Sequence, residues 1–243
     1  MNKLLYMLMG FIPLFATSCM DVDNFEEPVS RIYGKVIDTT TGENFITEQG
    51  GFSIRIWEKS WSDQPTPLDL PVKQDGTFNN SRMFSGTYDM LPNNGAFWPA
   101  DTIRGVKVES SCEQVFEVTP YLHITDVNSR LEGTTLYLSC KLHAPITQNL
   151  PTVKEIRPFV SLTQFCGVNN RINEYFKDDY RCLINQNWWD GVGNMETGIS
   201  DRTYELPPLT LKSGRTFYVR IGANVRSASE SYNYSPVLEI KVP

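Results

Sequence analysis

The chain has 243 residues and carries 22 Lys and Arg against 28 Asp and Glu, a formal net charge of −6 at pH 7. This acidic balance argues against nucleic acid as a partner, because binding to phosphates needs a basic face. It also argues against electrostatic adhesion to an anionic membrane surface. Aromatic residues at 12%, with 15 prolines and 16 glycines, are typical of a β-rich secreted protein.

The N-terminal segment MNKLLYMLMGFIPLFATS combines one lysine, an apolar stretch and three small residues directly before Cys19. This arrangement predicts a lipoprotein signal peptide at residues 1–18, with Cys19 as the first mature residue and the lipidated one. A membrane-spanning helix needs about 20 apolar residues, and this stretch is shorter and contains Pro13. An ordinary cleaved secretory signal is the remaining alternative. Residues 19–29 are acidic and lack periodicity, so we expect a lipidated acidic tether.

Short alternating stretches predict a first all-β domain at residues 30–121. Ile54 and Ile56 alternate in FSIRIWE, and Asp75-Gly76 is typical of a tight turn. The series G-x-V-x-D-x-x-T-G, I-R-I, D-G-T-F and G-T-Y resembles the transthyretin-like, carboxypeptidase-regulatory-like β-sandwich. The resemblance implies that fold but no activity, because such modules accompany enzymes and transporters alike.

A second β domain is predicted at residues 122–243, after a hinge that we place between Thr119 and Asp126. TTLYLSCKL alternates strictly and places four apolar side chains on one face: Leu136, Leu138, Cys140 and Leu142. The stretches TFYVRIGA and VLEIKV predict two further strands, with Phe217, Val219 and Ile221 of the first directed inward. IRPFVSL is expected to be an edge-tolerant strand because Pro158 lacks an N–H.

The C-terminal stretch from LPPLTLKSG to LEIKV resembles the end of a fibronectin type III or related immunoglobulin-like sandwich. Phe217 stands where that fold usually has a tyrosine. The fold class we expect is therefore all-β, with two consecutive β-sandwich domains.

Four cysteines follow Cys19, namely Cys112, Cys140, Cys166 and Cys182. An even number in an exported protein permits two disulfides. Cys140 falls on the apolar face of its strand and is expected to be a buried free thiol, whereas Cys166–Cys182 is the favoured pairing. No Cys-x-x-Cys pair and no Cys/His cluster indicates a metal site.

The sequence contains none of the common catalytic signatures, such as G-x-S-x-G, H-E-x-x-H, a phosphate-binding loop or a Rossmann fingerprint. His123 and His143 are the available bases near neutral pH, and both flank a predicted strand. The 28 acidic residues would permit a glycosidase-like pair, but two small sandwiches offer few clefts for one. We therefore expect no enzymatic activity and no cofactor.

A long insert at residues 163–201 shows little strand alternation, and such long loops are often functional. It holds aromatic rings beside amide and carboxylate groups: Tyr175, Tyr180, Asn187, Trp188, Trp189 and Asp190. Rings can stack on the apolar faces of sugars while the polar groups bind hydroxyls, so these residues form a candidate glycan site. The alternative is that one of the two tryptophans caps the core. Neighbours on a strand point in opposite directions, which would leave one ring buried and the other exposed.

Three tryptophans of the first domain are further candidates, namely Trp57, Trp61 and Trp98. Trp57 opposes the inward face of its strand, and the other two lie in loops rich in turn formers, where packing of the loop is the alternative role. Asp190 with Asn194 could suggest calcium, but regular ligand spacing is missing, so no metal is expected.

The series ITEQ…IRIWE…PTPLDL…DGTFNN…FSGTYDMLP…FWPAD…VTPYL resembles a two-domain Bacteroidetes lipoprotein family of unknown function from SusC/SusD-type polysaccharide-utilisation loci. The resemblance implies an outer-membrane protein at the cell surface, held by its N-terminal lipid. It also implies polysaccharide or oligosaccharide ligands and SusC/SusD-type partner proteins. The acidic residues after Cys19 resemble a surface-export signal but are not contiguous, which leaves the periplasmic face as an alternative.

The sequence thus predicts a non-catalytic cell-envelope lipoprotein that binds glycans or assists their uptake. The alternative is a structural or assembly partner of an uptake complex that binds protein and not sugar.

Overall fold

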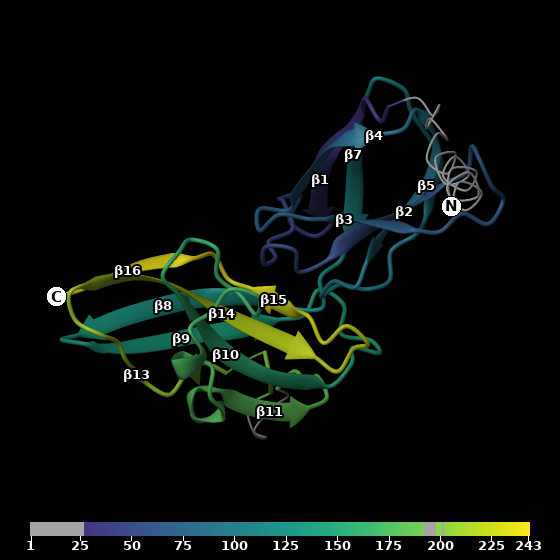
Figure 1. Cartoon of the computed structure of the whole chain (residues 1–243). Coiled ribbons are helices and arrows are strands. Elements are labelled where there is room, and N and C mark those ends of the chain that lie inside the picture. Colours follow the sequence, from purple (N-terminus) through teal and green to yellow (C-terminus); the bar gives the residue numbers. More distant parts are fainter. Residues whose placement is uncertain (1–26, 192–197, 201) are drawn as a thin grey trace, which may run out of the picture.

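The computed structural model describes residues 27–191, 198–200 and 202–243. Within this part the chain is nearly all β and forms two domains, which confirms the predicted fold class (Figure 1). The predicted lipidation site Cys19 and nearly all of the predicted tether lie outside the described residues. No helix among the described residues is long and apolar enough to cross a membrane.

The N-terminal domain packs a sheet of order β4–β1–β7 against a sheet of order β3–β2–β5–β6. The strands are β1 (Ser30–Asp38), β2 (Ser53–Glu58), β3 (Leu68–Pro71), β4 (Thr77–Met83), β5 (Gly86–Asn93), β6 (Ile103–Val108) and β7 (Ser111–Val118). Strand β1 runs antiparallel to β4 and parallel to β7. Apolar residues from both sheets form one buried core between them.

Two glycines of the N-terminal motif have clear structural reasons. Gly76 adopts a φ of 78° in the turn before β4, as expected for the Asp75-Gly76 turn. Gly34 allows β1 and β7 to approach, since a Cβ there would lie 1.8 Å from the Gln114 carbonyl oxygen. The motif therefore reflects backbone geometry in the sandwich and carries no chemistry of its own.

The C-terminal domain also has two sheets. One places β9 between β8 and the short strands β12 and β13; the other has the order β11–β10–β14–β15, with β16 also paired to β14. The strands are β8 (His123–Glu132), β9 (Thr135–His143), β10 (Val153–Ser161), β11 (Cys182–Gln186), β12 (Tyr204–Glu205), β13 (Leu209–Thr210), β14 (Arg215–Val225), β15 (Tyr232–Tyr234) and β16 (Leu238–Val242). The chain ends at the side of this domain that lies away from the first domain (Figure 1).

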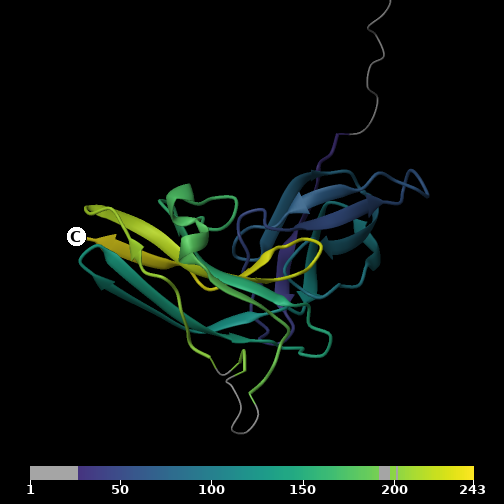
Figure 2. The ribbon, with the colours of Figure 1, turned by 90° about the horizontal axis from the view of Figure 1, so that it is seen from below.

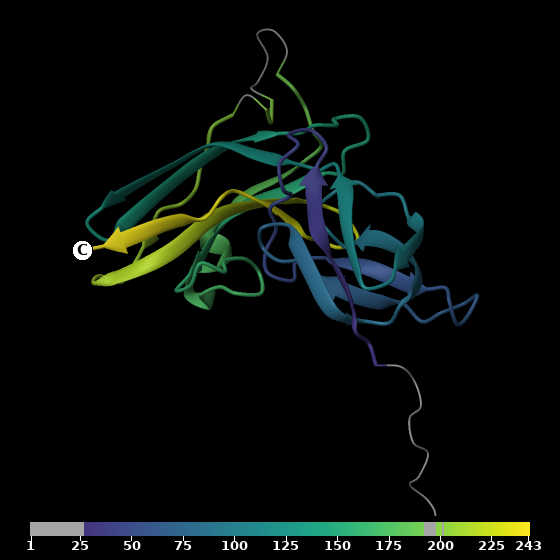
Figure 3. The same ribbon diagram turned by 90° about the horizontal axis from the view of Figure 1, so that it is seen from above.

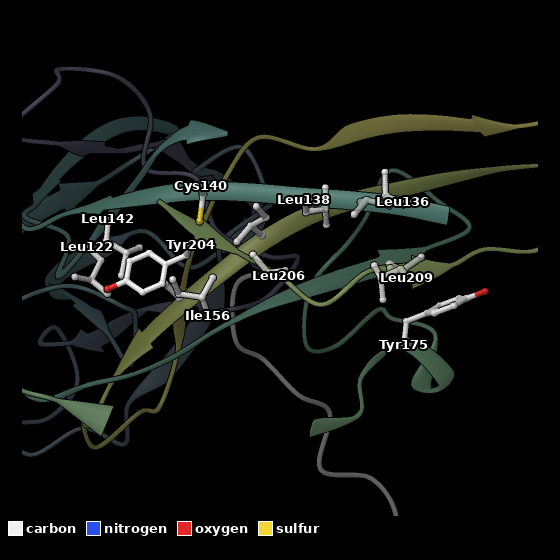
Figure 4. Close-up of a cluster of buried hydrophobic side chains, with 14 of the residues drawn as sticks. Leu122, Leu136, Leu138, Cys140, Leu142, Ile156, Tyr175, Tyr204, Leu206 and Leu209 are labelled. Carbon is white, nitrogen blue, oxygen red and sulfur yellow. The ribbon is translucent and has the colours of Figure 1, made fainter. Parts of the chain in front are cut away.

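The predicted inward face of β9 is confirmed. Its four apolar side chains are at most 4% exposed, and Figure 4 shows them directed into a core that also receives Ile156 and Leu206. Cys140 lies in this core as a free thiol, as expected.

The favoured disulfide between Cys166 and Cys182 is wrong, because all four described cysteines are free. The Cys166 sulfur lies 3.3 Å from the Phe159 carbonyl oxygen, whereas the Cys182 sulfur lies 3.2 Å from that of Glu205. Cys166 faces the outer side of the sheet formed by β10 and β14, whereas Cys182 packs against the core on its inner side. The sheet therefore lies between the two thiols.

The first half of strand β10 lies between two neighbouring strands of its sheet, whereas the second half forms the edge of that sheet. It pairs with β14 along its whole length, but β11 pairs with it only as far as Ile156. Pro158 lies just beyond the end of β11, where its missing N–H breaks no pairing with that strand. The expectation of an edge-tolerant strand therefore fits the second half of β10.

From Val219 to Val225, strand β14 is buried on both faces, which alternation alone did not predict. Phe217, Val219 and Ile221 point inward as expected, yet Arg220 on the outer face is 0% exposed. The start of the insert covers this outer face with Cys166, Val168 and Phe176. The start of the expected 163–201 loop thus covers the sheet. The loop continues through η1 (Asn173–Tyr175) and η2 (Asp178–Tyr180) to β11, which extends the sheet beside β10.

The connection between the domains is short and hydrogen-bonded. The Trp98 amide donates to the Thr119 carbonyl at 2.9 Å, and the Tyr121 amide donates to the Ala96 carbonyl at 3.2 Å. The Trp98 and Tyr121 rings pack with their centroids 5.3 Å apart. Asp126, the far end of the expected hinge, already lies within β8. Figures 2 and 3 show the domains from two further sides, with the green turns of the insert projecting beside the junction.

Candidate functional site

A cleft of about 590 Å³ lies between the two domains. Loops of the N-terminal domain form one wall, and the start of the insert with the outer faces of β14 and β16 forms the other. The lining side chains used below are Gln49, Lys73, Asp75, Phe165, Tyr218 and Glu239. Clefts at domain junctions in this size range are common ligand sites in proteins.

The register of two strands sets the wall of the C-terminal domain. Tyr218 alternates with the buried residues Phe217 and Val219, so its ring lies on the outer face of β14. Its partner in β16 is Glu239, which places an aromatic ring and a carboxylate side by side. Phe165 reaches the same cleft from the insert and is 42% exposed. The cleft therefore combines two rings with nearby polar groups.

Arg220 forms the floor of the cleft and holds the domains together. It donates from Nη1 to the carbonyl oxygens of Thr47, at 2.8 Å, and Cys166, at 3.2 Å, and from Nε to that of Ser235 at 3.0 Å. Its guanidinium carbon lies 4.1 Å from the centre of the Tyr234 ring. Burial lowers the pKa of Arg220 to about 10, so the group still carries its charge at neutral pH.

Glu48 joins this junction from the N-terminal domain. Its carboxylate accepts hydrogen bonds from the Asn169 amide at 2.6 Å and from the Tyr234 hydroxyl at 3.1 Å. Burial raises the pKa of Glu48, although these hydrogen bonds and the charge of Arg220 oppose the shift. A Cβ at Gly167 would lie 2.4 Å from the Glu48 Cβ, so the insert fits closely against the carboxyl side chain.

Gln74 fixes the start of the insert. Its amide nitrogen donates to the Gln164 carbonyl at 2.9 Å, and its amide oxygen accepts from the Cys166 amide at 3.0 Å. Asp75 beside it accepts from the Thr77 hydroxyl at 2.7 Å. Partial burial alone would raise the pKa of Asp75, but the hydrogen bonds from Thr77 outweigh it and hold the pKa below its usual value. Asp75 is therefore an ionised acceptor at the rim.

The candidate residues of the insert do not line this cleft. Trp188 packs against the core of the C-terminal domain and donates from its indole nitrogen to Asp190 at 3.0 Å, whereas Trp189 is 39% exposed. Asn187 is exposed and accepts from the Thr152 hydroxyl at 2.7 Å. These residues remain a separate candidate surface at the end of β11. Asn194, named with Asp190 for calcium, lies outside the described residues.

The two tyrosines proposed for the insert have mainly packing roles. Tyr175 is only 3% exposed and lies beside Leu209 in the core (Figure 4). A buried ring offers no face to a sugar, so the ligand-binding role predicted for Tyr175 is wrong. Tyr180 is half-buried against the same core.

The three tryptophans of the N-terminal domain lie apart from one another. Trp57 is half-buried on the outer face of β2, opposite Asp89 of β5. Trp61 is 70% exposed in the loop after β2. Trp98 packs against Tyr121 and the core of the other domain, which is the packing role weighed for it.

Sequence reasoning missed the cleft because its residues come from five separate segments. Alternation with its inward neighbours implies that Tyr218 points outward, but no local pattern brings it together with Phe165 of the insert. The two histidines lie at another part of the junction. His123 lies 2.9 Å from the Thr40 hydroxyl and 3.3 Å from the Asp38 carboxylate, and its ring stacks with His143.

Two family models match the chain. One is described as "Protein of unknown function (DUF3823) N-terminal domain" and matches residues 30–119. The other is described as "Domain of unknown function (DUF3823_C)" and matches residues 122–239. No curated protein matches the chain.

Several solved structures share the fold. A "putative carbohydrate binding protein" from Bacteroides uniformis is 24% identical, with a TM-score of 0.72 over 88% of this chain and 99% of its own. A DUF3823 family protein from the same species is 23% identical, with a TM-score of 0.68 over 89% and 100% of the two chains. One from Parabacteroides merdae is 19% identical, with a TM-score of 0.64 over 89% and 100%.

Proposed function

The chain belongs to the two-domain DUF3823 family, and we propose that this member is a non-catalytic cell-envelope lipoprotein that binds a glycan in the cleft between its domains. In this proposal it serves a SusC/SusD-type polysaccharide-utilisation system as a binding or uptake-accessory component. The lipid on Cys19 holds it at the outer membrane, facing the cell surface.

The composition of the cleft is the observation that carries the proposal. Phe165 and Tyr218 supply apolar ring faces of the kind that stack on the C–H surfaces of sugars. Gln49, Asp75 and Glu239 supply amide and carboxylate groups for hydroxyls in the same cleft. The junction contacts of Arg220 and Glu48 hold the two walls in place, which reduces the ordering that a ligand would otherwise require.

A structural relative adds support of a weaker kind. The Bacteroides uniformis protein with the same two-domain fold is described as a "putative carbohydrate binding protein". At 24% identity the similarity concerns the fold, so the glycan assignment for this chain depends on its own cleft.

A binding role fits the cleft better than catalysis does. Both oxygens of the Glu48 carboxylate are occupied by the Asn169 amide and the Tyr234 hydroxyl. Neither histidine lines the cleft, and His123 lies in a neighbouring hollow beside Asp38 and Asn44. Turnover of any glycan by the purified protein would contradict this part of the proposal.

Titration calorimetry against a panel of soluble glycans tests the binding role. We expect at least one polysaccharide to bind and Tyr218→Ala to weaken that binding by about tenfold, which corresponds to the loss of an aromatic contact that contributes about 1.4 kcal/mol. Lys107→Ala in β6, away from the cleft, is the matched control and should leave binding unchanged. If no glycan binds, or if Tyr218→Ala binds normally, the proposed site is wrong.

The lipid anchor has its own test. Cys19→Ser removes the residue expected to carry the lipid, so the folded protein should appear in the soluble fraction. Loss of surface labelling in intact cells should accompany this change. A Cys19→Ser protein that stays with the membrane would contradict the lipoprotein assignment.

An assembly role is the second candidate, favoured by exposed apolar side chains around the loop between β2 and β3. Trp61 is 70% exposed and Leu68 is 63% exposed. If this loop docks on a SusC/SusD-type complex, Trp61→Ala with Leu68→Ala should abolish co-purification of that complex. The same double variant should leave glycan binding in the cleft unchanged.

A further inference from the structure

The cleft has two compartments that meet at Phe165. The larger hollow measures about 590 Å³, and a neighbouring hollow of about 260 Å³ lies on the insert side. Gln49 and Phe165 line both hollows. The smaller hollow also contains Asn169 and Asn170, whose exposed side chains offer further amide groups.

The backbone on both sides of Phe165, the residue between the two hollows, is fixed by contacts with the N-terminal domain. The Gln74 side chain bonds both Gln164 and Cys166, the residues on either side of Phe165. On the other side, Gly167 packs directly against Glu48. Phe165 therefore projects from a backbone fixed before and after it, and its ring is 42% exposed. A ligand that fills both hollows would pass along Gln49 and this ring, because both side chains line the two hollows.

The charges around the two hollows disfavour an anionic ligand. Asp75 and Glu239 line the larger hollow with exposed carboxylates. Lys241 lies 3.3 Å from Glu239 but does not line either hollow. Lys73 is the one exposed cation among the described residues that line the hollows. Arg220 is buried, and carbonyl oxygens and the Tyr234 ring already contact its guanidinium. The net charge of −6 for the whole chain adds to this repulsion.

We propose that the cleft takes a neutral oligosaccharide of at least two sugar units, whose chain crosses Phe165 from the larger hollow into the smaller one. This inference rests on the proposed glycan-binding function and specifies its ligand. One unit stacks near Tyr218 in the larger hollow. The next unit lies in the smaller hollow, where Asn169 and Asn170 provide hydrogen-bonding groups.

The test uses defined neutral oligosaccharides of one to six units from glucan, mannan and galactan series, measured by calorimetry with the full chain. We expect the affinity to rise at least tenfold from one unit to two. Phe165→Ala should remove this gain, so that the variant binds the one-unit and two-unit sugars with equal affinity. Phe84→Ala is the matched control, since Phe84 has a similar exposure of 40% but lies in the turn between β4 and β5.

A second arm tests the charge. The neutral oligosaccharide that binds most tightly is compared with a derivative of the same oligosaccharide whose primary hydroxyls have been oxidised to carboxylates. We expect at least tenfold weaker binding of the oxidised form, with the difference reduced by Asp75→Asn or by added salt.

Three results would overturn the inference alone: equal affinity for one and two units, normal two-unit binding by Phe165→Ala, or equal binding of the oxidised form. In each of these cases a loss of binding in Tyr218→Ala would still support the proposed function. Failure of every oligosaccharide and polysaccharide to bind would overturn both.

Discussion

The Nη1 nitrogen of Arg220 in the C-terminal domain donates a hydrogen bond to the Thr47 carbonyl oxygen, 2.8 Å away in the N-terminal domain. The same guanidinium reaches Cys166 and Ser235, so one side chain bonds three segments from both domains. A charged group that is 0% exposed is tolerated only when acceptors surround it. The domain junction therefore depends on Arg220 more than on any exposed ion pair.

Arg220→Met should lower the free energy of unfolding by about 3 kcal/mol, because it leaves the carbonyl acceptors and Glu48 without their cation. We also expect the two domains to unfold in separate transitions in calorimetry, since the cross-domain bonds are lost. Arg104→Met is the control: its side chain is 78% exposed, and the change should stay within about 0.5 kcal/mol. A single transition at the wild-type midpoint would contradict the role given to Arg220.

Two buried carboxyl groups should give opposite pH dependences of stability. Burial raises the pKa of Glu48 above its unfolded value, so the folded state holds its proton to higher pH. The contribution of Glu48 is then fully present below the unfolded pKa and is lost as the pH rises through the folded pKa. Glu48→Gln should therefore become more favourable relative to wild type between pH 4 and pH 7, as measured by urea denaturation.

Glu155 is the internal comparison. Burial alone would raise its pKa, but hydrogen bonds from Tyr232, Arg181 and Arg157 hold the pKa below its usual value. Its contribution is present above the unfolded pKa and is lost as the pH falls through the folded one. Glu155→Gln should therefore cost most stability near neutral pH and least in acid. Parallel pH profiles for the Glu48 and Glu155 variants would contradict both assignments.

Much of the sandwich architecture follows from local pattern. Strand β9 has one face in the core and the other half-exposed, so its period-two pattern predicts its orientation correctly. The Asp75-Gly76 turn is likewise encoded by residues adjacent in sequence. Where a strand is buried on both faces, as β14 is from Val219 to Val225, alternation identifies only one of its two environments.

The cleft could not be predicted in the same way. Arg220 is buried because Thr47, 173 residues earlier, approaches it, and no local pattern records such a contact. Sequence reasoning favoured large aromatic residues for the ligand, yet Trp98 and Tyr175 are used for packing. Tyr218 and Phe165 were not selected because their shared environment forms only when the two domains meet.

The thiols should differ sharply in reactivity. Burial raises the pKa values of Cys140 and Cys166 to about 12, so little of either is thiolate at pH 8. Cys112 and Cys182 are only partly buried. In the native protein we expect N-ethylmaleimide to modify Cys112 and Cys182 first, with all four sites modified in urea. Peptide mass spectrometry reads each site, and a Cys166–Cys182 disulfide in that experiment would contradict the structure.

Variants of the adjacent residues Trp188 and Trp189 can distinguish the cleft from the other candidate binding surface at the end of β11. Trp188 packs against the core, so Trp188→Ala should cost about 2 kcal/mol of stability, less than the ~3–5 kcal/mol typical of a fully buried tryptophan. Trp189 is 39% exposed, and Trp189→Ala should change stability by less than about 0.5 kcal/mol.

Because neither ring lines the cleft, the folded Trp189→Ala protein should bind glycan within about twofold of wild type, whereas Tyr218→Ala should not. Calorimetry of both variants against the same oligosaccharide compares the two surfaces directly, with urea denaturation confirming that each variant is folded. A large loss of affinity in Trp189→Ala, with Tyr218→Ala unchanged, would move the binding site to the end of β11. Such a result would restore the aromatic insert as the sugar-binding element and leave the cleft as a structural junction.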